Sequence, residues 1–320
     1  GELERYAPNG MPWIYQIKET IPSGYTSASG GETWTTGDPV DGVLSAGTIT
    51  NSITQTVYYR KQWLNSDGST VDEDYLGTEI TVTFQLQVRN ATGSKWANAE
   101  TFFQNALSAE DYAKLFGSYD FTPELTGRIN DSTVWGRNHP FGSLPKFITV
   151  NQQTTQLTYR VIETGIYWDD DTTPKITVSV ENDSKDSWQY RFTWNGTGTS
   201  PFSPKAEAYT SSIFTIQNYL NTTGITVRKE WDGDQGNAYG TRPTTGRDDY
   251  NWEVSLLVQY STDNTTWSTL VTYEKAADDT FQPHPVILHV YGVNKQDVST
   301  ANAALSGLPT HDLEGNTLQY

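Results

Sequence analysis

The stretch TVYYRKQW at residues 56–63 alternates like a β-strand but places a lysine on its apolar face. Successive side chains of a strand point to opposite faces, so alternate residues share one face. The residues that share the apolar face are Val57, Tyr59, Lys61 and Trp63. A lone lysine at such a position usually packs its stem and returns its ammonium group to water. The recurrence of the pattern elsewhere in the chain favours a different interpretation.

The lysine belongs to a set of three polar residues that recurs along the chain. GITVRKEW repeats the alternation and again places a lysine, Lys229, two residues before a tryptophan. Ahead of each lysine segment, GTITNSITQ and SIFTIQNYL place Asn51 and Asn218 among apolar residues. PWIYQIKET and QLTYRVIET align without gaps on Glu19 and Glu163, which also share a face with apolar residues. Such internal similarity indicates repeated modules.

The order of these elements divides the chain into modules that run from a lysine strand through a variable middle to a glutamate strand and an asparagine strand. Residues 1–51 are predicted to be the C-terminal part of one module, and residues 52–223 a complete module. Residues 224–320 are predicted to be the N-terminal part of a further module. Within the complete module, residues 89–150 and 168–205 look like insertions. We expect the chain to be a window from a longer repetitive polypeptide.

The composition indicates an all-β chain. Aromatic residues make up 13% of the sequence, with 11 Trp and 19 Tyr, and turn signals recur at short intervals. Two stretches, near 98–116 and 294–306, are predicted to be helical. In the first of them, Ser108 is the expected N-cap of a short helix that Gly117 closes. We therefore expect β-sandwiches with small helical insertions.

The charge and the absence of cysteine exclude several kinds of partner and site. The net charge of −17 argues against nucleic acid, because phosphate binding needs a basic surface. Without cysteine there are no disulfides or thiolate metal sites, and no apolar run of about 18 residues predicts a membrane span. The acidic loops WDGDQGN and WDDDT lack the further acid of a calcium site, and the histidines lack a zinc spacing. No metal and no cofactor are expected.

The recurring lysine, glutamate and asparagine have complementary chemistry when they are buried together. Burial disfavours the charged forms of an amine and of a carboxyl group, and a neutral amine is a nucleophile. Lys61 would attack the side-chain amide carbon of Asn218 while protonated Glu163 polarises the carbonyl and relays protons. Ammonia would leave and a Lys–Asn isopeptide bond would remain. The chain would carry out this single turnover on itself, so we do not expect an enzyme with an external substrate.

Three of the motifs, in this order, resemble the Cna-B-type domains of Gram-positive surface adhesins and pilus shaft proteins. They are VRKEW, LTYRVIET and FTIQN, and the pair Arg242-Pro243 ahead of NWEVSLLVQY is similar to that family as well. The resemblance implies tandem immunoglobulin-like β-sandwiches, each with an internal Lys–Asn isopeptide bond that a glutamate promotes. The chain departs from the pattern in two ways. Its complete module is longer than a compact module of this kind, and no Arg-Pro pair follows KQW.

By position, the resemblance implies a role for each recurring residue. Lys61 would bond Asn218, and Glu163 would promote the reaction. Glu19 would have the same promoting role in the first module. The cross-linking residues whose partners would lie outside this segment or in a neighbouring copy are Asn51 and Lys229.

The resemblance also implies a structural role, as a stalk or fibre segment of a bacterial cell-surface adhesin or pilus-like protein. The location would be extracellular, at the surface or cell wall of a Gram-positive-type bacterium, and the partners would be neighbouring modules of the same polypeptide or fibre. A cross-link between an early strand and the last strand would load a covalent bond instead of a ladder of hydrogen bonds. It would also constrain the unfolded chain by about a few kcal/mol.

Two other functions stay open. An adhesin region could bind a host protein or glycan through an insertion, with residues 89–150 as the first candidate. A secreted carbohydrate-active enzyme with β-sandwich accessory modules is the third hypothesis, although no short motif singles out its carboxylate pair. The aromatic strand face in SWQYRFTW is expected to be core rather than a sugar-binding platform. Its residues are Trp188, Tyr190, Phe192 and Trp194.

Overall fold

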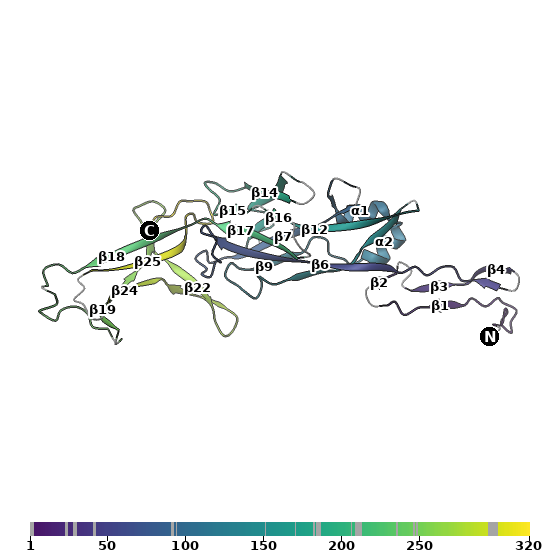
Figure 1. The fold of residues 1–320 in the computed structure, drawn as a ribbon, viewed down its shortest axis with the longest axis horizontal. Coiled ribbons are helices and arrows are strands. Elements are labelled where there is room, and N and C mark those ends of the chain that lie inside the picture. The colour runs from purple at the N-terminus through teal and green to yellow at the C-terminus, as the bar shows by residue number, and fades with distance from the viewer. Residues whose placement is uncertain are drawn as a thin grey trace.

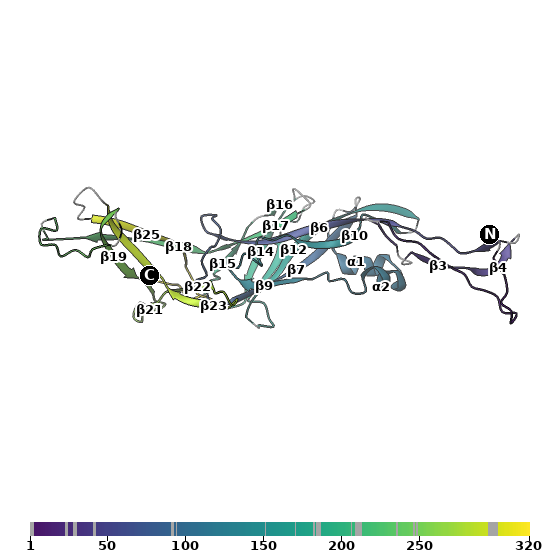
Figure 2. The ribbon, with the colours of Figure 1, turned by 90° about the horizontal axis from the view of Figure 1, so that it is seen from below.

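The computed structural model is an elongated all-β molecule with its largest body in the middle (Figures 1 and 2). The N-terminal strands form one end, and the strands that follow the middle body form the other (Figure 1). The described residues are 3–22, 25–27, 31–40, 43–90, 93, 95–150, 152–169, 171–181, 183, 187–205, 207–208, 213–234, 236–245, 247, 249–293 and 300–320.

The first of two large sheets in the middle body contains the lysine motif. Its long strand β6 (Ser52–Asn65) begins one residue after Asn51 and includes the whole TVYYRKQW stretch. The strand β17 (Ile213–Leu220) lies parallel to β6 on one edge, and β10 (His139–Pro145) lies antiparallel on the other. The remaining strands are β15 (Phe202–Pro204), which pairs with β17, and β2 (Tyr25–Thr26), which pairs with β6.

The second large sheet contains the glutamate motif on β12 (Gln153–Trp168). This strand is flanked by β7 (Glu79–Asn90) and β13 (Ile176–Glu181), both antiparallel to it. The same sheet continues beyond these neighbours at both edges. Its other strands are β14 (Ser187–Trp194), β16 (Glu207–Ala208), β8 (Ala97–Asn98), β9 (Glu124–Arg128) and β11 (Phe147–Val150).

The apolar faces of these two sheets form a single core. Tyr59 of β6, Phe84 of β7 and Ile216 of β17 belong to one cluster of buried residues, and the rings of Tyr59 and Phe84 lie 4.9 Å apart. The two ranges that look like insertions contribute to this sandwich, since residues 89–150 supply β9 and β10 and residues 168–205 supply β13 and β14. They are therefore built into the fold rather than appended to it.

Two short helices, α1 (Ala99–Ala106) and α2 (Ala109–Phe116), occupy the first stretch that the sequence predicts to be helical. The N-cap prediction is confirmed, because the hydroxyl of Ser108 accepts the backbone N–H of Asp111 at 3.1 Å. Gly117 follows the last residue of α2, also as predicted.

These helices are anchored in the core by aromatic residues. Phe103 and Phe116 are buried, with their ring centroids 4.5 Å apart, and Phe103 stacks at 6.5 Å on Tyr159 of β12. Removing the segment would open the core, so its deletion would disturb the fold as well as any surface that it carries.

The second helix prediction, near 294–306, is wrong where the structure describes the chain. Residues 300–306 belong to β25 (Thr300–Pro309), which pairs antiparallel with β18 (Thr222–Glu230). The alanines of TANAALSG favour a helix by local propensity, but pairing with a neighbouring strand overrides such weak preferences. Residues 294–299 lie outside the described residues.

The two ends of the molecule hold only small sheets. At the N-terminal end, the strand pairs are β1 (Gln16–Lys18) with β3 (Glu32–Trp34) and β4 (Thr36–Val40) with β5 (Val43–Ser45). At the other end, next to β18 and β25, the pairs are β19 (Tyr250–Leu257) with β24 (Ile287–Val293), β20 (Gln259–Tyr260) with β21 (Ser268–Thr269), and β22 (Val271–Lys275) with β23 (Phe281–Pro285). Neither end forms a sandwich as large as the middle body.

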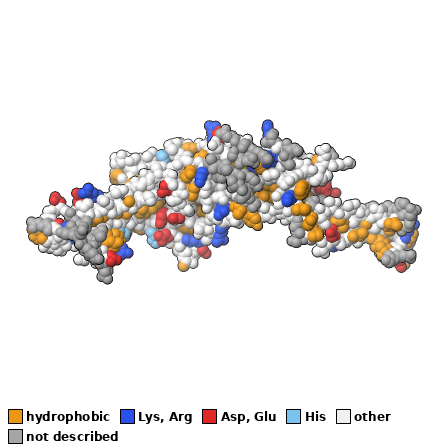
Figure 3. All heavy atoms as spheres, viewed as in Figure 1, with side chains coloured by type: hydrophobic (Ala, Val, Ile, Leu, Met, Phe, Trp, Pro, Cys, Tyr) orange, Lys and Arg blue, Asp and Glu red, His pale blue; other side chains and the backbone are white. Residues whose placement is uncertain are grey.

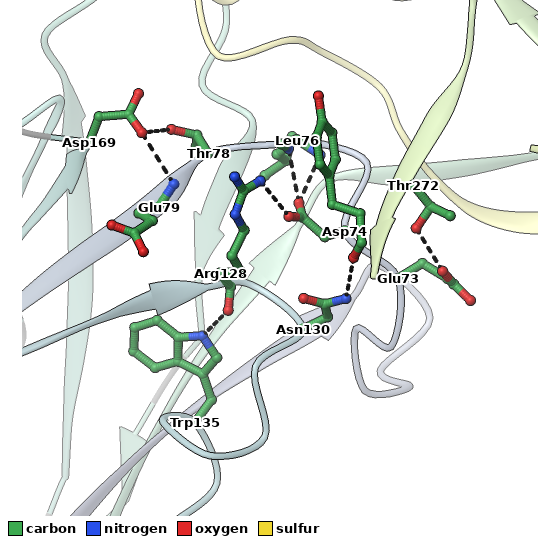
Figure 4. A network of polar contacts seen from close by, with 12 residues as sticks. Glu73, Asp74, Leu76, Thr78, Glu79, Arg128, Asn130, Trp135, Asp169 and Thr272 are labelled. Atoms are coloured by element: carbon green, nitrogen blue, oxygen red, sulfur yellow. Dashed lines mark hydrogen bonds and ion pairs between the residues drawn. The ribbon is translucent and has the colours of Figure 1, made fainter. Parts of the chain in front are cut away.

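A polar network joins the middle sandwich to the C-terminal strands (Figure 4). The carboxylate of Asp74 is fully buried and accepts a hydrogen bond from the guanidinium of Arg128 at 3.2 Å. The same guanidinium lies 4.8 Å from the ring centroid of Tyr273 on β22. The backbone N–H of Tyr273 donates to the carbonyl of Asp74 at 3.0 Å, and Asn130 donates to the carbonyl of Tyr273 at 3.1 Å. The C-terminal strands are therefore fixed to the sandwich by several independent contacts.

The turn that follows Asp74 packs closely against Tyr273 of the C-terminal strands. Gly77 has a φ of 68°, and a Cβ atom there would collide with the ring of Tyr273, so only glycine fits. Burial raises the pKa of Asp74 above its ordinary value, and the hydrogen bonds from the N–H of Gly77 and from Arg128 oppose that shift.

Candidate cross-linking site

Lys61 points into the core from β6, and its side chain has no exposed surface. Val57, Tyr59 and Trp63 on the same face are also buried, which confirms the predicted alternation. The Nζ atom lies 4.4 Å from the ring centroid of Trp63, so aromatic surface covers one side of the amine. The ammonium group does not escape to water as a strand lysine usually does.

Glu163 reaches this lysine from the opposite sheet. Its side chain is fully buried, and its Oε2 lies 2.8 Å from the Nζ of Lys61. The register of β12 against β7 shifts between Glu163 and Gly165, and irregularities of this kind re-aim a side chain. The backbone N–H of Glu163 donates to the hydroxyl of Tyr190 on β14 at 3.2 Å. This hydrogen bond fixes the backbone of Glu163, whose carboxylate faces the lysine.

Asn218 completes the group from β17. Its Nδ2 donates to both carboxylate oxygens of Glu163, at 2.8 and 3.0 Å. In the parallel register, Lys61 pairs with Ile216 and Trp63 pairs with Asn218, so Lys61 and Asn218 are diagonal neighbours on one face. The Oδ1 of Asn218 is buried and has no hydrogen-bond partner among the described residues. The structure thus brings together the three residues that the sequence predicts to meet.

In this arrangement the carboxylate of Glu163 contacts both the amine and the amide. A group that relays protons between them needs this position. As placed, the carboxylate of Glu163 accepts hydrogen bonds from both the amine of Lys61 and the amide of Asn218. The two ends of an amide are told apart only by their hydrogen bonds. With the Asn218 amide turned by half a turn, its unpaired Oδ1 would face Glu163 and accept from a protonated carboxyl group. The geometry therefore suits both protonation states of Glu163.

Aromatic residues pack around Trp63, which covers the amine, in a way that the sequence does not predict. Trp135 lies edge-on to Trp63 at 5.8 Å between ring centroids, and Phe202 lies 4.8 Å from Trp63. The backbone N–H of Gly136 donates to the carbonyl of Lys61 at 2.8 Å. Trp135 and Phe202 come from the two segments that look like insertions. The variable middle of the module therefore closes the site, and no spacing in the sequence signals that contact.

A second glutamate–asparagine pair lies near the N-terminal end and repeats part of the geometry. The Nδ2 of Asn51 donates to the two carboxylate oxygens of Glu19, at 2.9 and 3.0 Å. The Oδ1 of Asn51 is buried without a hydrogen-bond partner among the described residues, as in Asn218. Both residues are half-buried rather than enclosed. No lysine of the described ranges is hydrogen-bonded to this pair.

Lys229 repeats the other part of the geometry at the far end of the molecule. Its Nζ lies 3.8 Å from the ring centroid of Trp231, as Lys61 lies over Trp63. The amine donates to the backbone carbonyl of Glu230 at 2.8 Å. Within the part of the chain that the structure describes, no side-chain carboxylate or amide is bonded to it. The structure therefore does not bring Lys229 together with either asparagine.

The other candidate sites have structural roles. Asp234 of the acidic loop WDGDQGN accepts hydrogen bonds from Nε and Nη2 of Arg242, at 2.5 and 3.0 Å, and these hydrogen bonds lower the pKa of Asp234. Across the described ranges, no group of three or more histidine, aspartate or glutamate side chains is arranged to hold a metal ion. Among those same residues, no helix combines the length and apolar character of a membrane span. Trp188 and Tyr190 are buried, as predicted for a core face.

Comparison with known proteins gives only distant structural likenesses. No protein-family model matches the chain, and no curated protein matches it. The shaft pilin SpaA from Lactobacillus rhamnosus GG aligns with 80% of this chain and 83% of its own, at 14% identity and a TM-score of 0.21. The pilus backbone protein RrgB from Streptococcus pneumoniae aligns with 90% of this chain at 8% identity and a TM-score of 0.17, and the chain covers 59% of that protein. These alignments do not assign the chain to a family.

Proposed function

We propose that the middle sandwich, residues 52–223, is a load-bearing module of an extracellular bacterial fibre, cross-linked by an isopeptide bond between Lys61 and Asn218. The observation that supports this function is the convergence of Lys61, Glu163 and Asn218, with no exposed side-chain surface, within hydrogen-bond distance. A buried ion pair is weak evidence for a stabilising role, because apolar residues of similar volume often serve as well. Reactivity accounts for the group better than stability does.

The reaction follows from the contacts of Glu163. A proton passes from the ammonium of Lys61 to the carboxylate across the 2.8 Å hydrogen bond, which leaves a neutral amine and a carboxylic acid. The amine attacks the Cγ atom of Asn218, and the acid donates to the amide as negative charge develops on its oxygen. A C–N bond to Nζ forms and the C–N bond to Nδ2 breaks as a second proton passes from the attacking nitrogen through Glu163 to the departing one. Ammonia then leaves with the proton first taken from Lys61, as an ammonium ion. The carboxylate is regenerated.

The position of the proposed bond supports a mechanical role. It ties β6, the first strand within residues 52–223, to β17, the last strand of the same sheet, and these strands already lie side by side. Neighbouring modules of the same polypeptide or fibre are the proposed partners, and the surface of a Gram-positive-type bacterium is the proposed location. Self-catalysed bond formation is the only chemistry that we propose for this site.

Intact-mass measurement of the purified chain tests the proposal. The mass should be lower than the sequence mass by one molecule of ammonia, and peptide mapping should find the peptides of Lys61 and Asn218 joined. The Lys61→Ala and Asn218→Ala variants should each regain the unmodified mass. Lys205→Ala is the matched control, because Lys205 bonds Gln217 at 2.6 Å, next to Asn218 in sequence, and should keep the bond. An unmodified wild-type chain would refute the proposal.

A further inference from the structure

We infer that the Glu19–Asn51 pair and Lys229 are the two halves of a second cross-linking site, which forms between two copies of this chain. The inference rests on the proposed function, because it uses the same chemistry, but it concerns different residues and a different product. The lysine of one copy meets the glutamate and asparagine of the next copy, and the result is a covalent head-to-tail fibre.

The acceptor half is already arranged as in the middle sandwich. Asn51 and Glu19 share two hydrogen bonds whose lengths, 2.9 and 3.0 Å, match the 2.8 and 3.0 Å of the buried pair. Asn51 also lines a groove of about 490 Å³. The other walls of this groove are largely apolar and include Tyr25, Ile53 and Phe147. Such a groove suits the stem of a lysine and the tryptophan that follows it.

The donor half is strand β18, which lacks a described neighbour on the edge that corresponds to the β17 side of β6. In the middle sandwich, the lysine strand β6 has the antiparallel β10 on one side and the parallel β17 on the other. The lysine strand β18 has the antiparallel β25 on one side. No described strand pairs with its other edge. An unpaired strand edge is a template for pairing with another chain.

The sequence around Asn51 fits that edge in a defined register. Lys61 pairs with Ile216, two residues before Asn218, and the corresponding residue before Asn51 is Ile49. The described residues 46–50 precede β6 and belong to no strand themselves. They are therefore available to add a parallel strand to a neighbouring sheet.

By the register of the middle sandwich, Lys229 of one copy pairs with Ile49 of the next, and Trp231 pairs with Asn51. The amine then reaches the face that carries Asn51 and Glu19, and the tryptophan lies beneath it. The incoming ammonium also complements the carboxylate of Glu19, since the hydrogen bonds of that carboxylate within the described ranges all come from Asn51.

The two halves lie on opposite sides of the middle body, as a head-to-tail assembly requires, because Asn51 precedes β6 where the N-terminal strands join it and Lys229 lies on β18 beyond the sandwich (Figure 1). Side chains at the N-terminal end also leave apolar surface uncovered (Figure 3). The large exposed hydrophobic residues there include Trp13, Ile14, Ile17, Trp34 and Val43. A small sheet with such a face needs a covering layer, and the β18–β25 sheet of the next copy would supply it. A heterologous contact of this kind repeats without closing and generates a fibre.

The covalent step balances as in the middle sandwich. The Nζ of Lys229 forms a bond to the Cγ of Asn51, the bond from Cγ to Nδ2 breaks, and ammonia leaves. Glu19 takes two protons in turn from the ammonium of Lys229 and passes both to the departing nitrogen, which leaves as an ammonium ion while the carboxylate is regenerated. No oxidant or co-reactant is required.

The experiment uses the full 320-residue chain at high concentration, with enough salt to screen its net charge of −17. Denaturing electrophoresis and intact mass should show a ladder of dimers and longer species, with one ammonia lost for each joint. Peptide mapping should find Lys229 bonded to Asn51. The Lys229→Ala and Asn51→Ala variants should each stay monomeric when incubated alone.

Mixing the two variants gives the sharpest test. Lys229→Ala keeps the acceptor half and Asn51→Ala keeps the donor half, so the mixture should form covalent dimers and nothing longer. Lys146→Ala is the matched control and should keep the full ladder, because Lys146 follows β10 and its backbone N–H bonds Ile53, close to Asn51. Wild-type chains that stay monomeric, or a ladder that survives Lys229→Ala, would overturn the inference.

The same samples separate the failure of this inference from the failure of the proposed function. Each monomer band reports the Lys61–Asn218 bond through its own mass. A monomer that has lost one ammonia but forms no ladder overturns only the inter-copy site. A monomer of unmodified mass overturns the proposed function as well.

Discussion

The Nζ of Lys61 and the Oε2 of Glu163 lie 2.8 Å apart in opposite sheets of the sandwich, and neither side chain is exposed to solvent. This contact links the two sheets. It also brings together the donor and the acceptor of the proposed proton transfer. The reaction therefore depends on a carboxyl group that can take up and release a proton at this position. Replacing that group without changing the packing separates its chemical role from its structural one.

The Glu163→Gln variant should fold but fail to form the cross-link. Glutamine keeps the volume and an acceptor oxygen for Lys61, but it cannot take the proton from the amine. Loss of a general acid–base group typically slows a reaction by about 10²–10⁴-fold, so the variant should keep its unmodified mass long after the wild type is complete. Mass spectrometry at intervals after refolding measures the rate of ammonia loss in each chain. Glu124→Gln, an exposed glutamate on β9, is the control, and equal rates in all three chains would contradict the assigned role.

The cross-link should also make a large contribution to the free energy of unfolding. A bond between Lys61 and Asn218 closes a loop of about 160 residues, and the chain-entropy model gives about 5 kcal/mol for such a loop. Glu163→Gln should lose this amount, and Lys61→Ala should lose more because it leaves the carboxylate of Glu163 buried without its cationic partner. Guanidinium unfolding followed by tryptophan fluorescence provides the comparison. A wild type no more stable than Glu163→Gln would count against a bond.

Arg128→Ala should loosen the joint between the middle sandwich and the C-terminal strands. The variant loses the hydrogen bond to buried Asp74 and the contacts of the guanidinium with Tyr273 and Phe281, at 4.8 and 5.2 Å from their ring centroids. We expect a loss of about 2–3 kcal/mol, since one member of a largely buried pair is removed.

Small-angle X-ray scattering should show a broader distribution of long distances in the Arg128→Ala chain. Arg191→Ala is the control, because the Arg191–Glu181 pair lies on an exposed face and should contribute less than about 1 kcal/mol. An unchanged scattering profile for Arg128→Ala would show that the other contacts hold the joint by themselves.

Asp74 gives this joint a pH dependence, and the sign follows from its raised pKa. Below the ordinary value of 3.8 the carboxyl is protonated in both the folded and the unfolded chain. As the pH rises from there through the folded pKa, the unfolded chain releases the proton first, so stability falls across this window. Arg128→Ala removes an opposing cation and should widen the window. Thermal melts should show a larger loss for this variant near neutral pH than near pH 4, and a loss independent of pH would refute the assignment.

The strand alternation and the members of the cross-linking group could be predicted from sequence, because both depend on local period and on recurrence. The sequence alternation places Lys61, Asn218 and Glu163 on the same faces as apolar neighbours. In the structure all three side chains are buried, as that alternation predicts. The sheet to which each strand belongs, and the packing of Trp135 and Phe202 against Trp63, depend on contacts between distant segments. No spacing rule encodes those contacts.

Other features escaped prediction for physical reasons that differ from case to case. The sequence of β25 predicts a helix because small residues have weak strand preferences. Pairing with β18 nevertheless makes the segment a strand. Arg160 is almost fully buried between Trp96 and Trp188, at 4.6 and 4.9 Å from their ring centroids, although nothing in its sequence neighbourhood distinguishes it from a surface arginine. Binding of a host protein or glycan, and carbohydrate hydrolysis, stay as predictions from sequence.

The parallel pairing of β6 and β17 has a consequence for the rest of the sandwich. The chain enters at Ser52 and leaves at Leu220, so the proposed bond between Lys61 and Asn218 would pass a pulling force directly from one strand to the other. Helices α1 and α2 and strands β7 to β15 would lie outside this path of the force and would not bear the load. Their loops could then change length, vary in sequence or open while the distance between Ser52 and Leu220 under load stays the same.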